Sequence, residues 1–120
     1  MTIKISVIGT GYLGATHAAA MAELGYDVVG VEVNPERLEA LREGRLPFYE
    51  PGLDDVVLEN IGNGRLRFTD DAASAAAWAD VQFLCVGTPQ QDGSKKADTS
   101  YLEAAIDALA PHIKQNALTV

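Results

Sequence analysis

Apolar residues along the chain fall into short β-branched runs that alternate with longer stretches at helical spacing. Residues 3–8, 28–33 and 81–86 are rich in Ile and Val, which predicts strands buried on both faces. Residues 12–24 are rich in Ala, Leu and Met and precede Gly25, a residue type that favours the end of a helix. The first part of the chain therefore reads as strand, helix, strand.

The same alternation continues to the end of the sequence. Asn34 and Pro35 are typical of an N-cap and a first helical position, and Asp70 or Asp71 caps an alanine-rich helix that ends at Trp78. The other expected elements are a helix that carries Leu38 and Leu41 and ends at Gly44, an irregular segment broken by Pro47, Pro51 and Gly52, a helix over 53–61, a strand over 66–69, a helix that begins near Asp98 or Thr99 and ends near Leu109, and a strand over 117–120.

Alternating strands and helices predict a parallel sheet with right-handed crossovers and helices on both faces. We therefore expect an α/β fold, a Rossmann-type doubly wound parallel sheet in which strand 81–86 lies beside strand 3–8, truncated within about the fifth strand. The 120 residues, 48% of them hydrophobic, match one domain over 1–120. A chain of this length buries about 65% of its unfolded surface, which is enough for a core.

Charge and cysteine content narrow the classes of partner. The 9 basic and 17 acidic residues give a net charge of −8, which opposes binding to nucleic acid or to an anionic membrane surface. The single cysteine, Cys85, cannot form an internal disulfide, and the sequence has neither an apolar run of about 18 residues nor a cleavable leader. We expect a soluble, cytoplasmic protein.

Gly9, Gly11 and Gly14 form a G-x-G-x-x-G motif directly between the first strand and the first helix. In this context the first glycine permits a tight turn, the second lets the backbone approach a pyrophosphate, and the third lets helix and strand pack closely. The N–H groups at the start of the helix, around Tyr12 and Leu13, would face the anion. The alternative is a turn that needs glycine for its shape alone.

Glu32 follows Gly11 by 21 residues and ends the second strand, where an acid can accept hydrogen bonds from an adenosine ribose. A 2′-phosphate about 4 Å from this carboxylate would cost several kcal/mol, so NAD should be favoured over NADP. Arg37 is near enough in sequence to neutralise such a phosphate, which makes the preference strong rather than absolute. The alternative for Glu32 is a solvated acid at a strand end.

The stretch Val86, Gly87, Thr88 and Pro89 ends the strand expected beside the first one. Ligands of open α/β sheets bind beyond the carboxyl ends of the strands, where strand order reverses. Gly87 would let the backbone approach a cofactor and Thr88 could form a hydrogen bond to it. A plain turn is an equally good interpretation of these residues alone.

The remaining reactive side chains do not predict a second site. Cys85 lies inside an apolar strand, where a small buried thiol with a raised pKa is expected. His17 and His112 have no His or Cys partners at metal spacing, so no metal site is expected. Lys95 and Lys96 lie in a polar loop, which is a solvated turn or, less simply, a lid over a ligand.

Taken in order, these segments resemble the N-terminal domain of the UDP-glucose 6-dehydrogenase family, part of the wider nucleotide-sugar dehydrogenases. The Y-E-P-G-L and V-G-T-P segments are more specific to that family than the glycine motif. The matching segments are I-G-T-G-Y-L-G at 8–14, V-E-V-N-P-E-R at 31–37, L-P-F-Y-E-P-G-L at 46–53, G-R-L-R-F-T-D at 64–70, V-G-T-P at 86–89 and D-G-S-K-K-A-D-T-S-Y at 92–101.

The resemblance implies an enzyme that oxidises the C6 alcohol of a UDP-hexose to a carboxylate with two NAD⁺, through a cysteine thioester. It also implies a homo-oligomeric parent enzyme that binds NAD and a UDP-sugar in nucleotide-sugar metabolism and polysaccharide biosynthesis. Carried over by position, Gly9, Gly11, Tyr12, Leu13 and Gly14 would cradle the pyrophosphate, Glu32 would bind the ribose, Arg37 would lie on the adenine side, and Val86, Gly87, Thr88 and Pro89 would lead toward the nicotinamide.

This sequence departs from the family at two places and lacks its catalytic residues. The family more often has aspartate where this chain has Glu32, and the pair Lys95 and Lys96 is unusual. The resemblance places the nucleophilic cysteine and its partners beyond residue 120, so we expect an NAD-binding fragment that does not catalyse by itself. Two alternatives stay open: a GDP-mannose or UDP-N-acetyl amino sugar dehydrogenase domain, or a non-catalytic module that senses NAD(H).

Overall fold

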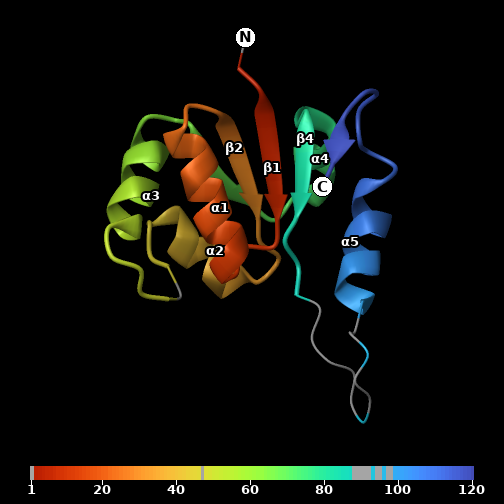
Figure 1. Ribbon diagram of the computed structural model, residues 1–120, viewed down its shortest axis with the longest axis horizontal. Helices are drawn as coiled ribbons and strands as arrows, with labels where there is room; N and C mark the ends of the chain where they lie inside the picture. Colours follow the sequence, from red (N-terminus) through yellow and green to blue (C-terminus); the bar gives the residue numbers. More distant parts are fainter. Residues whose placement is uncertain (1, 47, 88–92, 94–95, 97–98) are drawn as a thin grey trace.

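The computed structural model describes residues 2–46, 48–87, 93, 96 and 99–120, and within them one sheet of parallel strands in the order β3-β2-β1-β4-β5 (Figure 1). The parallel α/β fold and the place of the fourth strand beside the first are thereby confirmed. The strands are β1 Lys4–Ile8, β2 Asp27–Val31, β3 Leu66–Thr69, β4 Val81–Leu84 and β5 Leu118–Thr119, and the helices are α1 Tyr12–Glu23, α2 Pro35–Arg42, α3 Leu53–Gly62, α4 Ala72–Trp78 and α5 Ser100–Leu109.

Alternate residues of the central strands supply two hydrophobic cores, one on each face of the sheet. Val7 and Val28 point toward α1, α2 and α3, whereas Ile8, Val29 and Val31 point toward α4 and α5. Figure 1 shows α1 in front of the sheet and α4 behind it. Because successive strand residues face opposite sides, a strand buried on both faces needs apolar residues at every position.

The helix boundaries follow the capping residues. Asn34 accepts hydrogen bonds from the N–H groups of the second and third residues of α2, and Asp71, rather than Asp70, caps α4 by accepting from Ser74 N–H at 3.0 Å. Gly25, with φ of +106°, follows the end of α1 as expected. Thr99 stands at the N-cap of α5 without a side-chain cap bond, and Asp98 lies outside the described residues.

Strand β4 is shorter and more exposed than the sequence pattern predicts. It ends at Leu84 rather than at Val86, and of its four residues only Gln82 is fully buried. It ends level with β1, since Leu84 pairs with Ile8, the last residue of β1, and its outer neighbour β5 pairs with only Val81 and Gln82. The predicted second strand likewise ends early, at Val31, although the amide of Glu32 still donates to the carbonyl of Thr69 at 2.9 Å.

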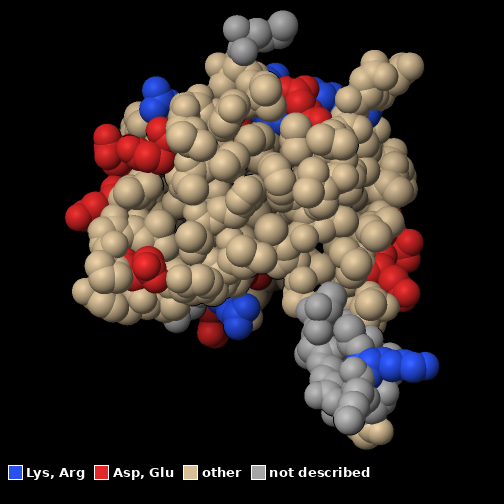
Figure 2. Space-filling view, viewed as in Figure 1, with Lys and Arg blue, Asp and Glu red and all other residues tan. Residues whose placement is uncertain are grey.

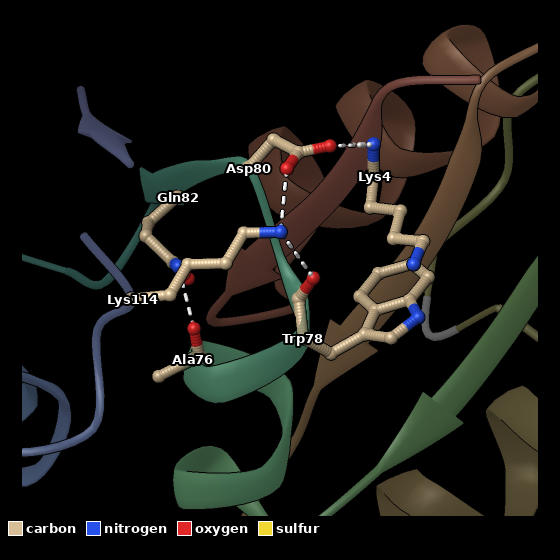
Figure 3. A network of polar contacts seen from close by, with 6 residues as sticks. All are labelled: Lys4, Ala76, Trp78, Asp80, Gln82 and Lys114. Carbon is tan, nitrogen blue, oxygen red and sulfur yellow. Dashed lines mark hydrogen bonds and ion pairs between the residues drawn. The ribbon is translucent and has the colours of Figure 1, made fainter. Parts of the chain in front are cut away.

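A buried polar contact joins β1, β4 and α4 in the middle of the sheet. Ser6 and Gln82 are both fully buried, and the Ser6 hydroxyl donates to Oε1 of Gln82. The amide nitrogen of Gln82 donates in turn to the carbonyl of Ala76 at 3.2 Å (Figure 3). Buried polar groups cost free energy unless they are paired, so these bonds fix the relative position of the two strands.

A second polar network lies at the amino ends of β1 and β4 (Figure 3). The Asp80 carboxylate accepts from the backbone N–H of Lys4 at 2.9 Å and from Nζ of Lys114 at 2.5 Å, and Lys114 also donates to the carbonyl of Trp78. The hydrogen bond from Lys114, followed by that from Lys4, lowers the pKa of Asp80. The Trp78 ring lies 4.8 Å from the Arg67 guanidinium.

Charged side chains are unevenly distributed over the molecule. Figure 2 shows acidic side chains over α3 on one side and over α5 on the other, while the middle of this face, over α1 and β4, carries few charges. On this face the charged side chains therefore lie toward the edges.

The first helix sits unusually close to the turn before it. Gly9 has φ of +90°, and a Cβ atom there would lie 2.9 Å from the carbonyl oxygen of Cys85. A Cβ atom on Gly14 would lie 1.8 Å from the carbonyl oxygen of Gly9, far inside van der Waals contact. At Gly11, in contrast, a Cβ atom would meet nothing within 4 Å. Two of the three motif glycines are therefore required by the fold itself, and the third is not.

We expect Gly14→Ala to lower the free energy of unfolding by about 3 kcal/mol, the upper end of the usual range for overpacking, because the added methyl collides with backbone. Gly11→Ala is the matched control and should lose less than about 1 kcal/mol, mainly because alanine is a poorer N-cap than glycine. Urea unfolding followed by circular dichroism measures both. Equal losses in the two variants would contradict this account of Gly14.

The Asp80 network predicts a pH-dependent stability. Because the folded-state pKa of Asp80 lies below its ordinary value of 3.8, the carboxylate stabilises the fold above that pH, and this contribution is lost as the pH falls through the lowered pKa. We expect Asp80→Asn to lower the urea midpoint at pH 7 and the difference from wild type to shrink below pH 3.8. Asp107→Asn is the control, because it removes the same negative charge at an exposed position of α5. A difference that stays constant with pH would refute the assignment.

Candidate functional site

A cleft of about 740 Å³ lies beyond the carboxyl ends of β1, β2 and β4. The glycine turn forms one wall and α5 forms the other. This is the place where strand order reverses, since β1 is flanked by β2 on one side and β4 on the other. The lining residues are Ile8, Gly9, Thr10, Gly11, Tyr12, Leu13, Val31, Glu32, Val33, Arg37, Ala72, Cys85, Val86, Gly87, Tyr101, Ala104, Ala105, Ala108 and Leu109.

Backbone hydrogen bonds hold the glycine turn against the strands on either side. The N–H of Gly9 donates to the carbonyl of Val31 at 3.1 Å, and the carbonyl of Ile8 accepts from the N–H of Cys85 at 2.8 Å. The turn is thus fixed to the ends of β2 and β4. Its second glycine, Gly11, is exposed and faces open space.

The N-terminus of α1 opens into this cleft without a cap. Gly11 is its N-cap residue and provides no side-chain hydrogen bond, whereas Asn34 caps α2 and Asp71 caps α4. The first N–H groups of a helix have no acceptor within the helix, and the helix dipole places partial positive charge there. Tyr12 and Leu13, at the start of α1, both line the cleft. This end of the cleft is therefore suited to an anion.

Glu32 is buried beside the turn, with only 7% of its surface exposed. Its Oε1 accepts from the Thr10 hydroxyl at 2.8 Å, and its Oε2 accepts from the backbone N–H of Asn34 at 3.1 Å. A carboxylate with both oxygens hydrogen-bonded is held in one orientation. It lines the same cleft as the uncapped helix end.

The structure brings most of the predicted site residues together. Arg37, in the first turn of α2, lines the cleft and also a smaller cavity of about 280 Å³ beside it. Val86 and Gly87 line the cleft from the end of β4. Gly14 does not line it and acts through packing instead. Thr88 and Pro89 lie outside the described residues.

Tyr12 connects the turn to the loop between α2 and α3. Its hydroxyl donates to the Glu50 carboxylate at 2.9 Å, and its ring centroid lies 4.7 Å from that of Phe48. The hydrogen bond to Glu50 raises the pKa of Tyr12, because ionised Tyr12 would face a negative charge. The Y-E-P-G-L segment therefore contacts the first residue of α1 through Glu50, a contact that the sequence pattern does not reveal.

Two parts of the cleft were not predicted from the sequence. Thr10 occupies a variable position of the glycine motif, and α5 contributes Ala104, Ala105 and Ala108 to the wall. The sequence predicted α5 as a helix but gave no signal that its alanines line a cleft, because small residues at helical spacing equally indicate close packing. Cys85 also reaches the cleft, half-buried, and burial raises the pKa of its thiol. A raised pKa disfavours the thiolate, as expected for a packing cysteine.

Other kinds of site find no support in the described part of the chain. It contains no group of three or more His, Cys, Asp or Glu side chains placed to hold a metal ion. The His17 imidazole packs edge-on against Phe83, with ring centroids 4.3 Å apart. Among the helices that the structure describes, none is long and apolar enough to cross a membrane.

Comparison with known proteins assigns the fold and the cleft to a family. Residues 3–120 match the profile of the UDP-glucose/GDP-mannose dehydrogenase family, NAD binding domain. The chain is 43% identical over 112 residues to the UDP-glucose 6-dehydrogenase of Rhizobium meliloti, which covers 93% of this chain and 26% of that protein. It is 42% identical over 120 residues to a UDP-N-acetyl-D-mannosamine dehydrogenase of Methanococcus maripaludis, covering 98% of this chain and 27% of that protein.

A solved structure agrees with these relatives. The UDP-glucose dehydrogenase of Pyrobaculum islandicum superimposes with a TM-score of 0.86 and 43% sequence identity, over 91% of this chain and 25% of that one. The chain thus spans about a quarter of the length of the proteins that it matches. It belongs to the UDP-glucose/GDP-mannose dehydrogenase family and forms the family's NAD-binding domain.

Proposed function

We propose that this chain is the NAD-binding part of a UDP-glucose 6-dehydrogenase, an enzyme that oxidises UDP-glucose to UDP-glucuronate with two NAD⁺. One structural observation carries the cofactor half of the proposal: an uncapped helix N-terminus and a buried carboxylate face the same cleft. The identity of 43% to a UDP-glucose 6-dehydrogenase supports the substrate half.

The residues present fit the parts of NAD. The first N–H groups of α1 would bind the diphosphate, and the open space at Gly11 would let that anion approach the backbone. Glu32 would accept hydrogen bonds from the adenosine ribose, and Arg37 would lie on the adenine side. The segment from Val86 to Pro89 would lead toward the nicotinamide. When bound, NAD supplies the hydride acceptor, and this chain supplies its binding and orientation.

The electrostatics of the cleft favour NAD over NADP. The Glu32 carboxylate is held beside the turn by two donors and cannot easily move away from a 2′-phosphate. Two like charges about 4 Å apart repel by several kcal/mol even at an effective dielectric of about 20. Arg37 lines the same cleft and would offset part of this repulsion.

The nucleotide sugar is argued from relatives alone, since the chain spans about a quarter of their length. A specific observation favours one other substrate, since the chain is 42% identical to a UDP-N-acetyl-D-mannosamine dehydrogenase over 98% of its length. GDP-mannose is a third candidate, because the family includes enzymes for it. The described residues form the cofactor cleft, which all three substrates would share.

Titration calorimetry of this chain with NAD⁺ and NADP⁺ tests the cofactor half. We expect NAD⁺ to bind at least about tenfold more tightly, because about 1.4 kcal/mol of the repulsion at Glu32 is enough for that factor. Gly11→Ala should retain the fold and lose most NAD⁺ affinity, since its methyl would stand where the diphosphate approaches the backbone. Equal or reversed cofactor preference, or full NAD⁺ affinity in Gly11→Ala, would refute the proposed binding mode.

A kinetic comparison of the full-length parent enzyme tests the substrate half. Purified enzyme is supplied with NAD⁺ and, in turn, UDP-glucose, GDP-mannose and UDP-N-acetyl-D-mannosamine, and NADH is followed by absorbance. We expect the highest kcat/KM for UDP-glucose and two NADH formed per UDP-glucose consumed. A higher kcat/KM for either other sugar, or a ratio of one, would show that the substrate assignment is wrong.

A further inference from the structure

Thr10 lies between Gly9 and Gly11, at a position where the G-x-G-x-x-G motif accepts any residue type. Its side chain is nonetheless buried, with 2% of the residue exposed, and its hydroxyl donates to Oε1 of Glu32 at 2.8 Å. We propose that Thr10 is a positioning residue that holds the Glu32 carboxylate toward the adenosine ribose and thereby strengthens the preference for NAD over NADP. This inference rests on the proposed NAD-binding mode.

The hydrogen bonds of Glu32 leave a matching set of acceptors for a ribose. A carboxylate offers about four lone-pair sites, two on each oxygen. Thr10 takes one site on Oε1, and the backbone N–H of Asn34 takes one on Oε2 at 3.1 Å. About one site on each oxygen is left, and an unmodified adenosine ribose presents two hydroxyl donors. The carboxylate is therefore oriented before any ligand binds.

Packing explains why the Thr10 hydroxyl points at Glu32. A Cβ atom on Gly30, in the buried strand β2, would lie 3.1 Å from Cγ2 of Thr10 and 2.7 Å from Cδ1 of Phe68. The missing side chain at Gly30 thus makes room for the Thr10 methyl group beside the Phe68 ring. Glycine is unfavourable inside a strand unless another group approaches closely. Gly30 and Phe68 together fix the Thr10 rotamer that presents the hydroxyl to Glu32.

Preorganisation of Glu32 should affect the two cofactors in opposite directions. A glutamate side chain loses rotamer freedom when a ligand orders it, which weakens binding of a ligand that needs it in one orientation. Without the Thr10 hydroxyl, only the Asn34 N–H would hold the Glu32 carboxylate, so more of its ordering would occur on binding and NAD⁺ affinity should fall. A freer carboxylate could also turn away from a 2′-phosphate, so the repulsion that disfavours NADP⁺ should weaken. The ratio of the two dissociation constants therefore reports the role of Thr10.

Calorimetric titration of Thr10→Val with NAD⁺ and NADP⁺ tests the proposal, because valine keeps the methyl group beside Gly30 and replaces the hydroxyl by a methyl group that cannot donate to Glu32. We expect NAD⁺ binding to weaken about threefold to tenfold, the usual effect of ordering one side chain, and NADP⁺ binding to stay equal or tighten. Thr10→Ser keeps the hydroxyl and should therefore keep most of the wild-type preference for NAD⁺ over NADP⁺. Thr16→Val is the matched control, since the Thr16 hydroxyl donates to the carbonyl of Tyr12 on the same helix and does not contact Glu32.

A double-mutant cycle with Glu32→Ala separates positioning from a general structural effect. If Thr10 acts through Glu32, Thr10→Val should leave the NAD⁺ dissociation constant of Glu32→Ala unchanged. Should Thr10→Val fail to fold, Thr10→Ser and Thr10→Ala form a second pair, because both lack the methyl and only serine keeps the hydroxyl. We then expect the cofactor preference to fall in the alanine variant alone.

The outcomes distinguish this inference from the function on which it rests. Wild-type affinities and cofactor preference in Thr10→Val, or an equal loss in the Glu32→Ala background, would overturn the role of Thr10 while the NAD-binding function stands. Equal affinities in the serine and alanine variants would overturn it as well. A wild-type chain that binds no NAD⁺ would instead contradict the proposed function, and the inference with it.

Discussion

The contact between Gly14 and the carbonyl oxygen of Gly9 is the constraint on which the site depends. A side chain at position 14 would overlap that oxygen, so the first turn of α1 lies directly against the turn that follows β1. This close approach points the uncapped start of α1 into the cleft at the carboxyl ends of β1, β2 and β4. Helix amides can act on an anion there because the sheet holds them in place at both sides, through Val31 and Cys85.

Both the backbone and the side chains contribute to the electrostatic potential in the cleft. The amides at the start of α1 provide positive potential from the backbone, whereas Glu32, which lines the same cleft, provides a negative charge. In a chain with a net charge of −8, the overall field opposes an anionic cofactor, so the binding mode that we propose depends on this local arrangement. In the binding mode that we propose, a diphosphate and a phosphate on the ribose would meet opposite local potentials, which would favour the first and disfavour the second.

Much of the fold could be predicted from the sequence because local pattern and global structure agree. β-branched runs became parallel strands, Asn34 and Asp71 capped the expected helices, and the glycine motif formed the expected turn. The extent of β4 could not be predicted, since it depends on where the neighbouring strand β1 ends beside it. Contacts between distant segments were also hidden: neither Thr10 with Glu32 nor Tyr12 with Glu50 has a sequence signal, because both arise from tertiary packing. Thr88 and Pro89 lie outside the described residues, so their predicted role stays a prediction.

The central claim is that main-chain amides at the start of α1 bind the diphosphate of NAD. Its most direct test is a titration of the ¹⁵N-labelled chain with NAD⁺, followed amide by amide in ¹H–¹⁵N correlation spectra. We expect the amides of Gly11, Tyr12 and Leu13 to shift most, together with the backbone amides of Glu32 and of Asn34, which donates to the Glu32 carboxylate, while the amides around Asp80 at the opposite end of the sheet do not respond. Saturable shifts confined to another surface, with these three amides unmoved, would contradict it.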